Sequence, residues 1–121
     1  MGNPAAETIT IEEFDQVDIR VGRVLAAEPL TGARKPAYTL RIDFGPEIGV
    51  RASSAQLTTR YQAEELVGRL VLGVVNLPPR RIAGFNSETL TLGVADADGA
   101  VVLLAVDPAW ASAVPLGARM F

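Results

Sequence analysis

The hydrophobic and polar positions of this chain follow the pattern of short strands. Over residues 38–44 apolar side chains alternate with polar ones, reading Tyr-Thr-Leu-Arg-Ile-Asp-Phe, which is the period of a strand with one buried face. A looser alternation over residues 17–25 predicts an earlier strand, with Gly22 at a bulge or bend. Residues 48–52 predict a third strand. The turn chemistry of residues 45–47 before it indicates that the second and third strands form a hairpin.

The second half of the chain continues the strand pattern. The apolar run 70–75 predicts a buried fourth strand, and residues 88–94 predict a fifth. Asp98-Gly99 is a strong signal for a tight turn, and the apolar run 101–106 follows it. The sequence therefore predicts one more hairpin near the C-terminal end.

Two short helices are expected beside these strands. Thr10 is followed three residues later by Glu13, which is a capping box and predicts a short helix or turn around residues 11–16. Good helix formers fill residues 62–67, and Gly68 stands where a helix commonly ends. Short strands with little helix predict an all-β fold, with a five-stranded OB-fold barrel as the first choice. An SH3-like barrel or a small sandwich are the alternatives.

The composition indicates one domain with an excess of apolar residues. A chain of 121 residues fits a single domain, yet 49% of its residues are hydrophobic. Either small aliphatic residues fill the core or a second copy covers part of the surface. The C-terminal tail carries more apolar area than a free terminus should show, which favours a homodimer; its large apolar residues are Trp110, Val114, Leu116, Met120 and Phe121.

The residue types exclude most catalytic chemistry. The chain contains neither cysteine nor histidine, so it has no thiol nucleophile, disulfide, imidazole base or Cys/His zinc site. Carboxylate pairs remain, but Asp96 and Asp98 belong to the predicted turn, and Glu64 and Glu65 to the polar face of a predicted helix. We therefore expect a protein that is not an enzyme and that needs neither a metal nor another cofactor.

The net charge and the apolar runs of the chain indicate which partners it can bind and where it is located. The formal net charge of −3 counts against tight nonspecific binding to nucleic acid. Residues 1–8 do not resemble a secretory signal, and the longest apolar runs, such as residues 100–106, are far shorter than a membrane span. These observations predict a cytoplasmic protein without membrane insertion.

The most informative candidate for binding is the segment Pro78-Pro79-Arg80-Arg81, which follows the apolar run 70–75 after two residues. Two prolines interrupt strand pairing and restrict the backbone, so the arginines that follow lose little freedom on binding. Arginine suits phosphate or carboxylate because its planar group donates two parallel hydrogen bonds. The alternatives are an ordinary surface turn or a structural salt bridge to Glu88 or Asp43.

Other polar and aromatic residues are weaker candidates. Arg34-Lys35 forms a second basic spot on a predicted loop, where a solvated turn is the alternative. Ser53, Ser54 and Gln56 can bind a peptide backbone or sugar oxygens. For Ser53 or Ser54, the alternative is that the hydroxyl satisfies amides that close the barrel. Phe85 can stack on a base, fill a pocket or belong to the core. The complete set of candidate ligand-binding residues is Arg34, Lys35, Ser53, Ser54, Gln56, Asn76, Pro78, Pro79, Arg80, Arg81, Phe85 and Ser87.

Four separated motifs carry a resemblance to a known family. They read FDQVDIRVGRV at 14–24, IDFG at 42–45, SSAQLT at 53–58 and VNLPPRRIAGF at 75–85. In this order they closely resemble the CsaA export-related chaperones, which belong to the wider tRNA-binding domain family of OB-fold modules. The resemblance extends over roughly residues 12 to 121.

The resemblance to the CsaA chaperones also implies an oligomeric state and a function. It implies a homodimer of OB-folds, with extensions outside the barrel at residues 1–13 and 107–121 that form the interface. It also implies a noncatalytic chaperone that binds unfolded polypeptides or preproteins for export. The alternative is a tRNA-binding module that uses the same surface. Stand-alone tRNA-binding modules of the wider family carry Ser-x-Gly-Met where this chain reads Ser87-Glu88-Thr89-Leu90.

Overall fold

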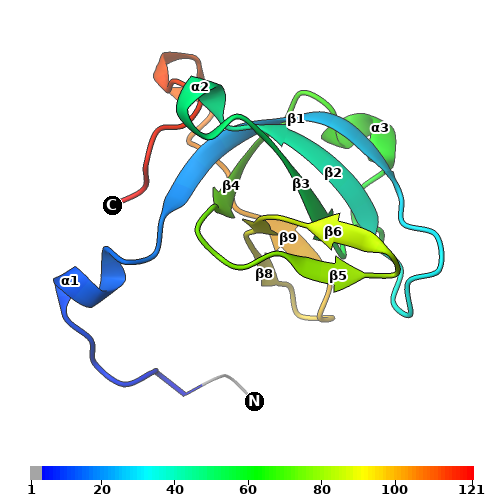
Figure 1. Ribbon diagram of the computed structural model, residues 1–121, viewed down its shortest axis with the longest axis horizontal. Coiled ribbons are helices and arrows are strands. Elements are labelled where there is room, and N and C mark those ends of the chain that lie inside the picture. The colour runs from blue at the N-terminus through cyan, green and yellow to red at the C-terminus, as the bar shows by residue number, and fades with distance from the viewer. Residues whose placement is uncertain (1–3) are drawn as a thin grey trace.

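The fold is built on one antiparallel sheet of five strands, in the order β3-β2-β1-β4-β7. The computed structural model describes residues 4–121 (Figure 1). The first three residues of the predicted N-terminal extension lie outside this range. The sheet contains β1 (Ile19–Pro29), β2 (Tyr38–Asp43), β3 (Val50–Ala55), β4 (Leu70–Val74) and β7 (Leu90–Thr91).

Two small hairpins and four short helical segments complete the structure. The hairpins pair β5 (Arg80–Ile82) with β6 (Phe85–Ser87), and β8 (Gly93–Ala95) with β9 (Val101–Leu103). The helices are α1 (Ile11–Phe14), α2 (Gly45–Ile48), α3 (Ala63–Leu66) and the 3₁₀ turn η1 (Ala111–Ala113). Among residues 4–121, none of these is long and apolar enough to cross a lipid bilayer.

The sheet curls until its two edges meet, which gives a nearly closed barrel. The N–H groups of Glu88 and Thr89 donate to the carbonyl of Ala52 at 2.8 and 3.2 Å, so the segment before β7 is joined to β3. The prediction of an all-β, five-stranded OB-fold is therefore confirmed.

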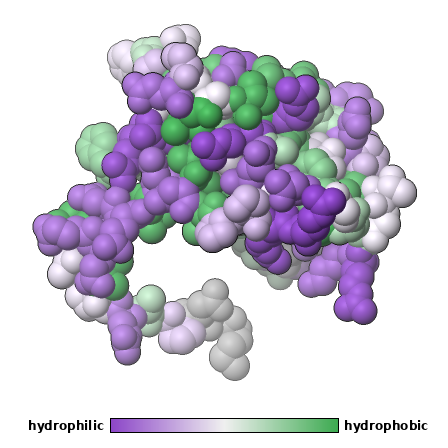
Figure 2. Space-filling model, in the orientation of Figure 1, coloured by the Kyte–Doolittle hydropathy of each residue, from purple (hydrophilic) through white to green (hydrophobic). Residues whose placement is uncertain are grey.

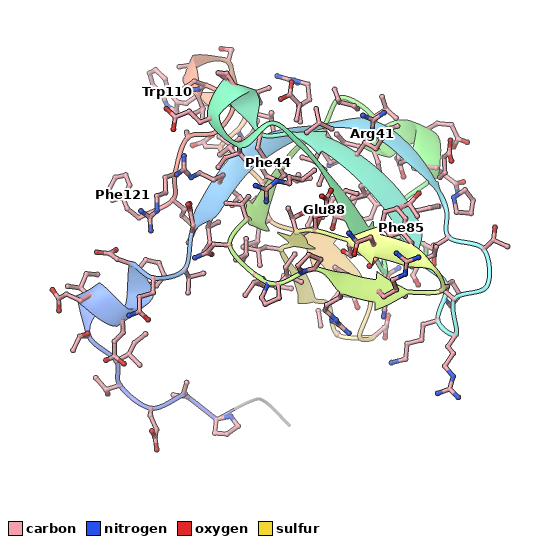
Figure 3. All side chains as sticks on the ribbon, in the orientation of Figure 1. Arg41, Phe44, Phe85, Glu88, Trp110 and Phe121 are labelled. Carbon is pink, nitrogen blue, oxygen red and sulfur yellow. The ribbon has the colours of Figure 1, made fainter. Side chains whose placement is uncertain are left out.

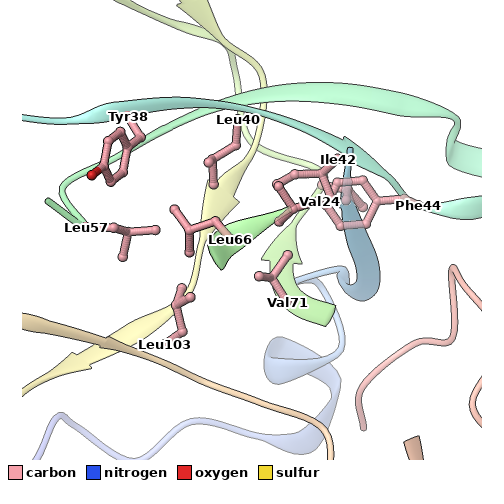
Figure 4. Packing of buried hydrophobic residues seen from close by; sticks show 10 residues of the cluster. Val24, Tyr38, Leu40, Ile42, Phe44, Leu57, Leu66, Val71 and Leu103 are labelled. Atoms are coloured by element: carbon pink, nitrogen blue, oxygen red, sulfur yellow. The ribbon is translucent and has the colours of Figure 1, made fainter. Parts of the chain in front are cut away.

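The core lies between the strands and α3 (Figure 4). Leu40, Ile42 and Phe44 alternate along β2 and its end, and all three are completely buried, as the strict pattern of residues 38–44 predicted. Burying each such side chain stabilises the fold by roughly 1.5–3 kcal/mol. The remaining members of the cluster are Val24, Tyr38, Leu57, Leu66, Val71, Val75 and Leu103.

Gly22 does not mark a bulge. The register shift of β1 falls between Val24 and Ala26, so the predicted position was wrong. A Cβ at Gly22 would lie 2.5 Å from Cγ2 of Ile42 and 2.8 Å from the Phe44 ring. Glycine stands here because the buried side chains of β2 pass directly over the backbone of β1.

The prediction of one continuous strand over residues 88–94 was wrong, because the structure has two short strands there, β7 and β8. The N–H of Leu92 donates to Leu72 of β4, whereas its carbonyl accepts from Leu104 beyond β9. The chain therefore leaves one sheet for the other at this residue, and β7 and β8 are separate strands. The predicted turn at residues 45–47 also differs, since it forms the single helical turn α2 before β3.

The elements α1, α3 and β9 are of the predicted type, but each is shorter than predicted. The Thr10–Glu13 capping box is present, but α1 ends at Phe14. The helix expected over residues 62–67 is α3, and the strand expected over 101–106 is β9, both of them shorter. The predicted hairpin at Asp98-Gly99 is confirmed by the pairing of β8 with β9.

The C-terminal tail packs on the barrel through its backbone. The N–H of Val21 donates to Ala118 at 3.0 Å, and the N–H of Gly117 donates back to Val21 at 2.8 Å. The tail thus lies beside the first part of β1, where β2 no longer pairs. Two of its aromatic side chains point away from the barrel, since Trp110 is 69% exposed and Phe121 is fully exposed (Figure 3).

Candidate functional site

A groove runs between the β5–β6 hairpin and the end of β3. It consists of two adjoining hollows of about 320 and 620 Å³, which share Ser54, Arg80, Ile82 and Leu90 in their walls. We call the smaller hollow the proline end, since Leu77, Pro78 and Pro79 line it. The larger hollow is the basic end, because Arg34 and Lys35 line it. Their shared walls make them one continuous site.

The hairpin that borders this groove was predicted only as a restrained loop. Its two-residue turn places Ala83 at a φ of 50° and Gly84 at a φ of 80°, which is the left-handed pair of a type I′ turn. The loop between β1 and β2, cyan in Figure 1, lies beside this turn. A Cβ at Gly32 in that loop would lie 3.9 Å from the Cβ of Ala83. The basic end therefore lies where these two loops approach each other.

The register of the hairpin separates the two arginines. Arg80 pairs with Ser87, Arg81 with Asn86, and Ile82 with Phe85. Because successive residues of a strand point to opposite faces, Arg80 shares a face with Ile82 and Arg81 lies on the other face. Arg80 accordingly lines both hollows, whereas Arg81 lines neither. A ligand in the groove would contact Arg80, whereas Arg81 faces solvent.

The cations around the groove are not neutralised by the protein. Within the part of the chain that the structure describes, the side chains of Arg34, Lys35, Arg80 and Arg81 form no ion pair, whereas Arg20, Arg60 and Arg119 each contact an aspartate at 2.6–3.5 Å. Figure 2 shows strongly hydrophilic residues gathered over the β5–β6 hairpin. A protein with a net charge of −3 thus keeps free positive charge at this groove.

The alternative of a salt bridge to Glu88 or Asp43 is not found. A carboxylate oxygen of Glu88 accepts the N–H of Ala52 at 2.8 Å, and one of Asp43 accepts the N–H of Gly45 at 2.9 Å. Both carboxylates therefore stabilise the backbone. Arg80 remains available to a ligand.

Two of the predicted polar residues hold the barrel together through their hydroxyl groups. Ser53 is completely buried, and its hydroxyl contacts the Thr89 carbonyl at 3.1 Å and the Thr91 hydroxyl at 2.8 Å. The Ser87 hydroxyl accepts the N–H of Ser54 at 3.0 Å. Ser53 and Ser87 thereby hold the wall of the groove. The sequence indicated such a structural use as an alternative for Ser53 or Ser54, but not for Ser87.

Asn76 lies away from the groove. Its side-chain amide accepts the N–H of Asp18 at 2.9 Å and donates to the carbonyl of Gln16 at 2.6 Å. It joins the segment after α1 to the end of β4. Of the remaining candidates, Ser54, Gln56, Pro78 and Pro79 line the groove, together with Arg34, Lys35 and Arg80. Phe85 is half-buried on the hairpin, outside the lining (Figure 3).

The structure adds apolar and hydroxyl groups that the sequence did not indicate. Ile82 and Leu90 line both ends of the groove, and Leu90 is 47% exposed. Thr89 lines the proline end, and its hydroxyl is the one buried side-chain polar atom among the described residues without a hydrogen-bond partner.

Comparison with known proteins decides the family. Residues 19–115 match the family described as "Putative tRNA binding domain". The chain belongs to this tRNA-binding domain family. Its relatives include the methionine–tRNA ligase of Porphyromonas gingivalis, which is 43% identical over 98 residues. These residues are 81% of this chain but 14% of the ligase, so the chain spans only a small part of that relative's length.

The solved structures that this chain resembles include two CsaA chaperones, and the similarity covers the whole of each of those chains. CsaA from Bacillus anthracis has 43% sequence identity and a TM-score of 0.85, with 95% of this chain and 100% of that chain covered. CsaA from Picrophilus torridus has 41% identity and a TM-score of 0.85, with 94% and 100% covered. The resemblance predicted from the four sequence motifs is confirmed.

Proposed function

We propose that the protein is a noncatalytic chaperone whose groove binds exposed segments of unfolded polypeptide. The observation that carries the proposal is the exposed apolar lining of the proline end, where Leu77 and Leu90 are each 47% exposed beside Pro78 and Pro79. Unfolded chains share exposed apolar side chains rather than a sequence, so an open apolar groove suits them. The full-length similarity to the CsaA chaperones supports the same function.

Suppression of client aggregation tests this proposal with a matched pair of variants. Leu77→Ser removes apolar area from the groove. Leu25→Ser removes the same side chain at a site that is 45% exposed but lines neither hollow. Light scattering of a heat-unfolded client protein should rise with the first variant and stay at the wild-type level with the second. Equal activity of both variants would place client binding elsewhere.

A second function, binding of tRNA, is favoured by the free cations at the basic end. Phosphates attract unpaired Arg and Lys, and backbone contacts supply most of the affinity of such complexes. The family match and the similarity to part of a methionine–tRNA ligase support it. Since both ligands would occupy one groove, unfolded polypeptide should displace labelled tRNA in a competition titration. Simultaneous binding of both would separate the two sites.

The proposal also includes a homodimer in the cytoplasm. The exposed Trp110 and Phe121 of the C-terminal tail, with Ile9 and Ile11 exposed near α1, offer apolar area to a second copy. Static light scattering should give the mass of a dimer for the full chain, and Trp110→Asp with Phe121→Asp should shift it toward the monomer. A monodisperse monomer for the unchanged chain would exclude the dimer.

A further inference from the structure

The outer edge of β3 is an unfinished strand edge that opens into the groove. The pairing of β2 with β3 places Ser54 opposite Thr39, and the N–H of Ser54 points away from β2 toward the Ser87 hydroxyl. Since alternate residues of a strand direct their backbone groups to the same side, Ala52, Ser54 and Gln56 all face the free edge.

The first half of this edge is satisfied by the protein itself. The N–H of Ala52 donates to the Glu88 carboxylate at 2.8 Å, and its carbonyl accepts from Glu88 and Thr89. The N–H of Ser54 donates to Ser87 at 3.0 Å. Side chains therefore take the place of a neighbouring strand as far as the Ser54 nitrogen.

Beyond that nitrogen the edge is free. Among residues 4–121, the carbonyl of Ser54 accepts only the hydroxyl of the neighbouring Ser53, at 3.3 Å. The N–H of Gln56 donates to no acceptor in residues 4–121. Both Ser54 and Gln56 line the basic end, and Ser54 also lines the proline end. One backbone acceptor and one backbone donor are thus presented, two residues apart, inside the groove.

We propose that a client segment binds in an extended conformation as an added strand on this edge, paired with the Ser54 carbonyl and the Gln56 N–H. The inference rests on the proposed binding of unfolded polypeptide and names how the chain is held. Every unfolded client offers N–H and C=O groups at the spacing of a strand, whatever its sequence. Alternate side chains of the added strand point to one face, where the apolar walls of the proline end receive them.

The geometry of Gln56 provides a variant that removes the donor alone. The N–H of Leu57 donates to the Ala55 carbonyl at 3.0 Å, so Gln56 is the central residue of a γ-turn. Among the described residues only Ala83 has a positive φ outside glycine, so the turn is the inverse form with a φ of about −75°. Proline accepts this φ, and Ala55 before it is already extended, as proline requires. Gln56→Pro therefore deletes the N–H, whereas Gln56→Ala deletes only the side chain.

The test measures fluorescence anisotropy with a labelled, unstructured peptide of about ten residues. A second peptide has the same side chains but esters in place of its central amides, so it lacks the N–H groups that the Ser54 carbonyl needs. Wild-type protein should bind the ester peptide about fivefold to tenfold more weakly than the amide peptide. Gln56→Pro should weaken binding of the amide peptide by a similar factor relative to Gln56→Ala, which removes the same side chain but keeps the N–H.

The outcomes separate this inference from the function on which it rests. If wild-type protein binds both peptides equally and Gln56→Pro behaves as Gln56→Ala does, strand addition is wrong while polypeptide binding stands. If wild-type protein does not bind the amide peptide, the proposed function itself is wrong. A dimer that Gln56→Pro dissociates would assign the edge to a second copy and contradict the proposal. Should Gln56→Pro fail to fold by circular dichroism, the comparison of the two peptides on wild-type protein decides alone.

Discussion

Arg80 and Arg81 provide a matched pair for testing where tRNA binds. They are neighbours on β5, both exposed, and neither forms an ion pair within residues 4–121. Changing either to Ala moves the net charge from −3 to −4, and either exposed substitution should alter the free energy of unfolding by no more than about 0.5 kcal/mol. Only Arg80 lines the groove.

The magnitude follows from the cations in the groove. Arg34, Lys35 and Arg80 line it, and each phosphate contact contributes about 0.9 to the slope of log affinity against log salt. The wild-type slope should therefore be about −2.7, and that of Arg80→Ala about −1.8. Between about 50 and 200 mM salt, the affinity for tRNA should fall about 40-fold for wild type but about 12-fold for Arg80→Ala. Arg81→Ala should keep the wild-type slope.

Anisotropy titrations with fluorescent tRNA at several salt concentrations measure these slopes directly. The groove account requires a difference between the two variants. If Arg81→Ala flattens the slope as much as Arg80→Ala does, tRNA contacts both faces of the hairpin. In that case the groove is not the tRNA site.

Further predictions concern the parts that shape the groove. Ala83→Asn should stabilise the protein by about 1 kcal/mol in urea unfolding, because alanine is strained at a positive φ that asparagine tolerates; no gain would mean that the turn relaxes. Gly22→Ala should destabilise by about 1–3 kcal/mol through overpacking against Ile42, and an unchanged unfolding midpoint would contradict the close contact. Phe85→Ser should leave suppression of client aggregation near the wild-type level, because Phe85 does not line the groove, whereas a strong loss of suppression without unfolding would extend the client site to the hairpin. A hydrogen bond from Arg20 lowers the pKa of Asp18 below its ordinary 3.8, so the pair stabilises the fold above that pH, and this contribution is lost as the pH falls through the lowered pKa. Asp18→Asn should flatten the decline of melting temperature between about pH 5 and pH 2, and an identical decline would refute this role.

Much of the barrel follows from local pattern. The strict alternation of residues 38–44 sets which face of β2 is buried, and the buried Leu40, Ile42 and Phe44 agree with it. The β5–β6 hairpin could not be predicted in the same way, since two prolines precede it and its turn uses Ala83 instead of the usual asparagine. The break at Leu92 depends on hydrogen bonds to two different sheets, which no local pattern contains.

The candidate site could be predicted only in part, because some of its features depend on contacts between distant parts of the chain. The basic residues and the prolines were visible in the sequence, and all of them except Arg81 line the groove. The opposite facing of Arg80 and Arg81 depends on a strand register that the loop prediction did not contain. The structural use of Ser53 and Asn76 depends on partners distant in the chain, at Thr89 and Asp18.

The central claim, that the groove holds unfolded polypeptide, is tested most directly by site-specific crosslinking. The chain has no cysteine, so a single cysteine that carries a benzophenone label can be placed at Leu90 in the groove or at Leu25, which is equally exposed outside it. With a reduced, unfolded client under light, the account predicts a crosslinked product from the Leu90 position and little from Leu25. Equal yields from the two positions, or a product from Leu25 alone, would contradict it.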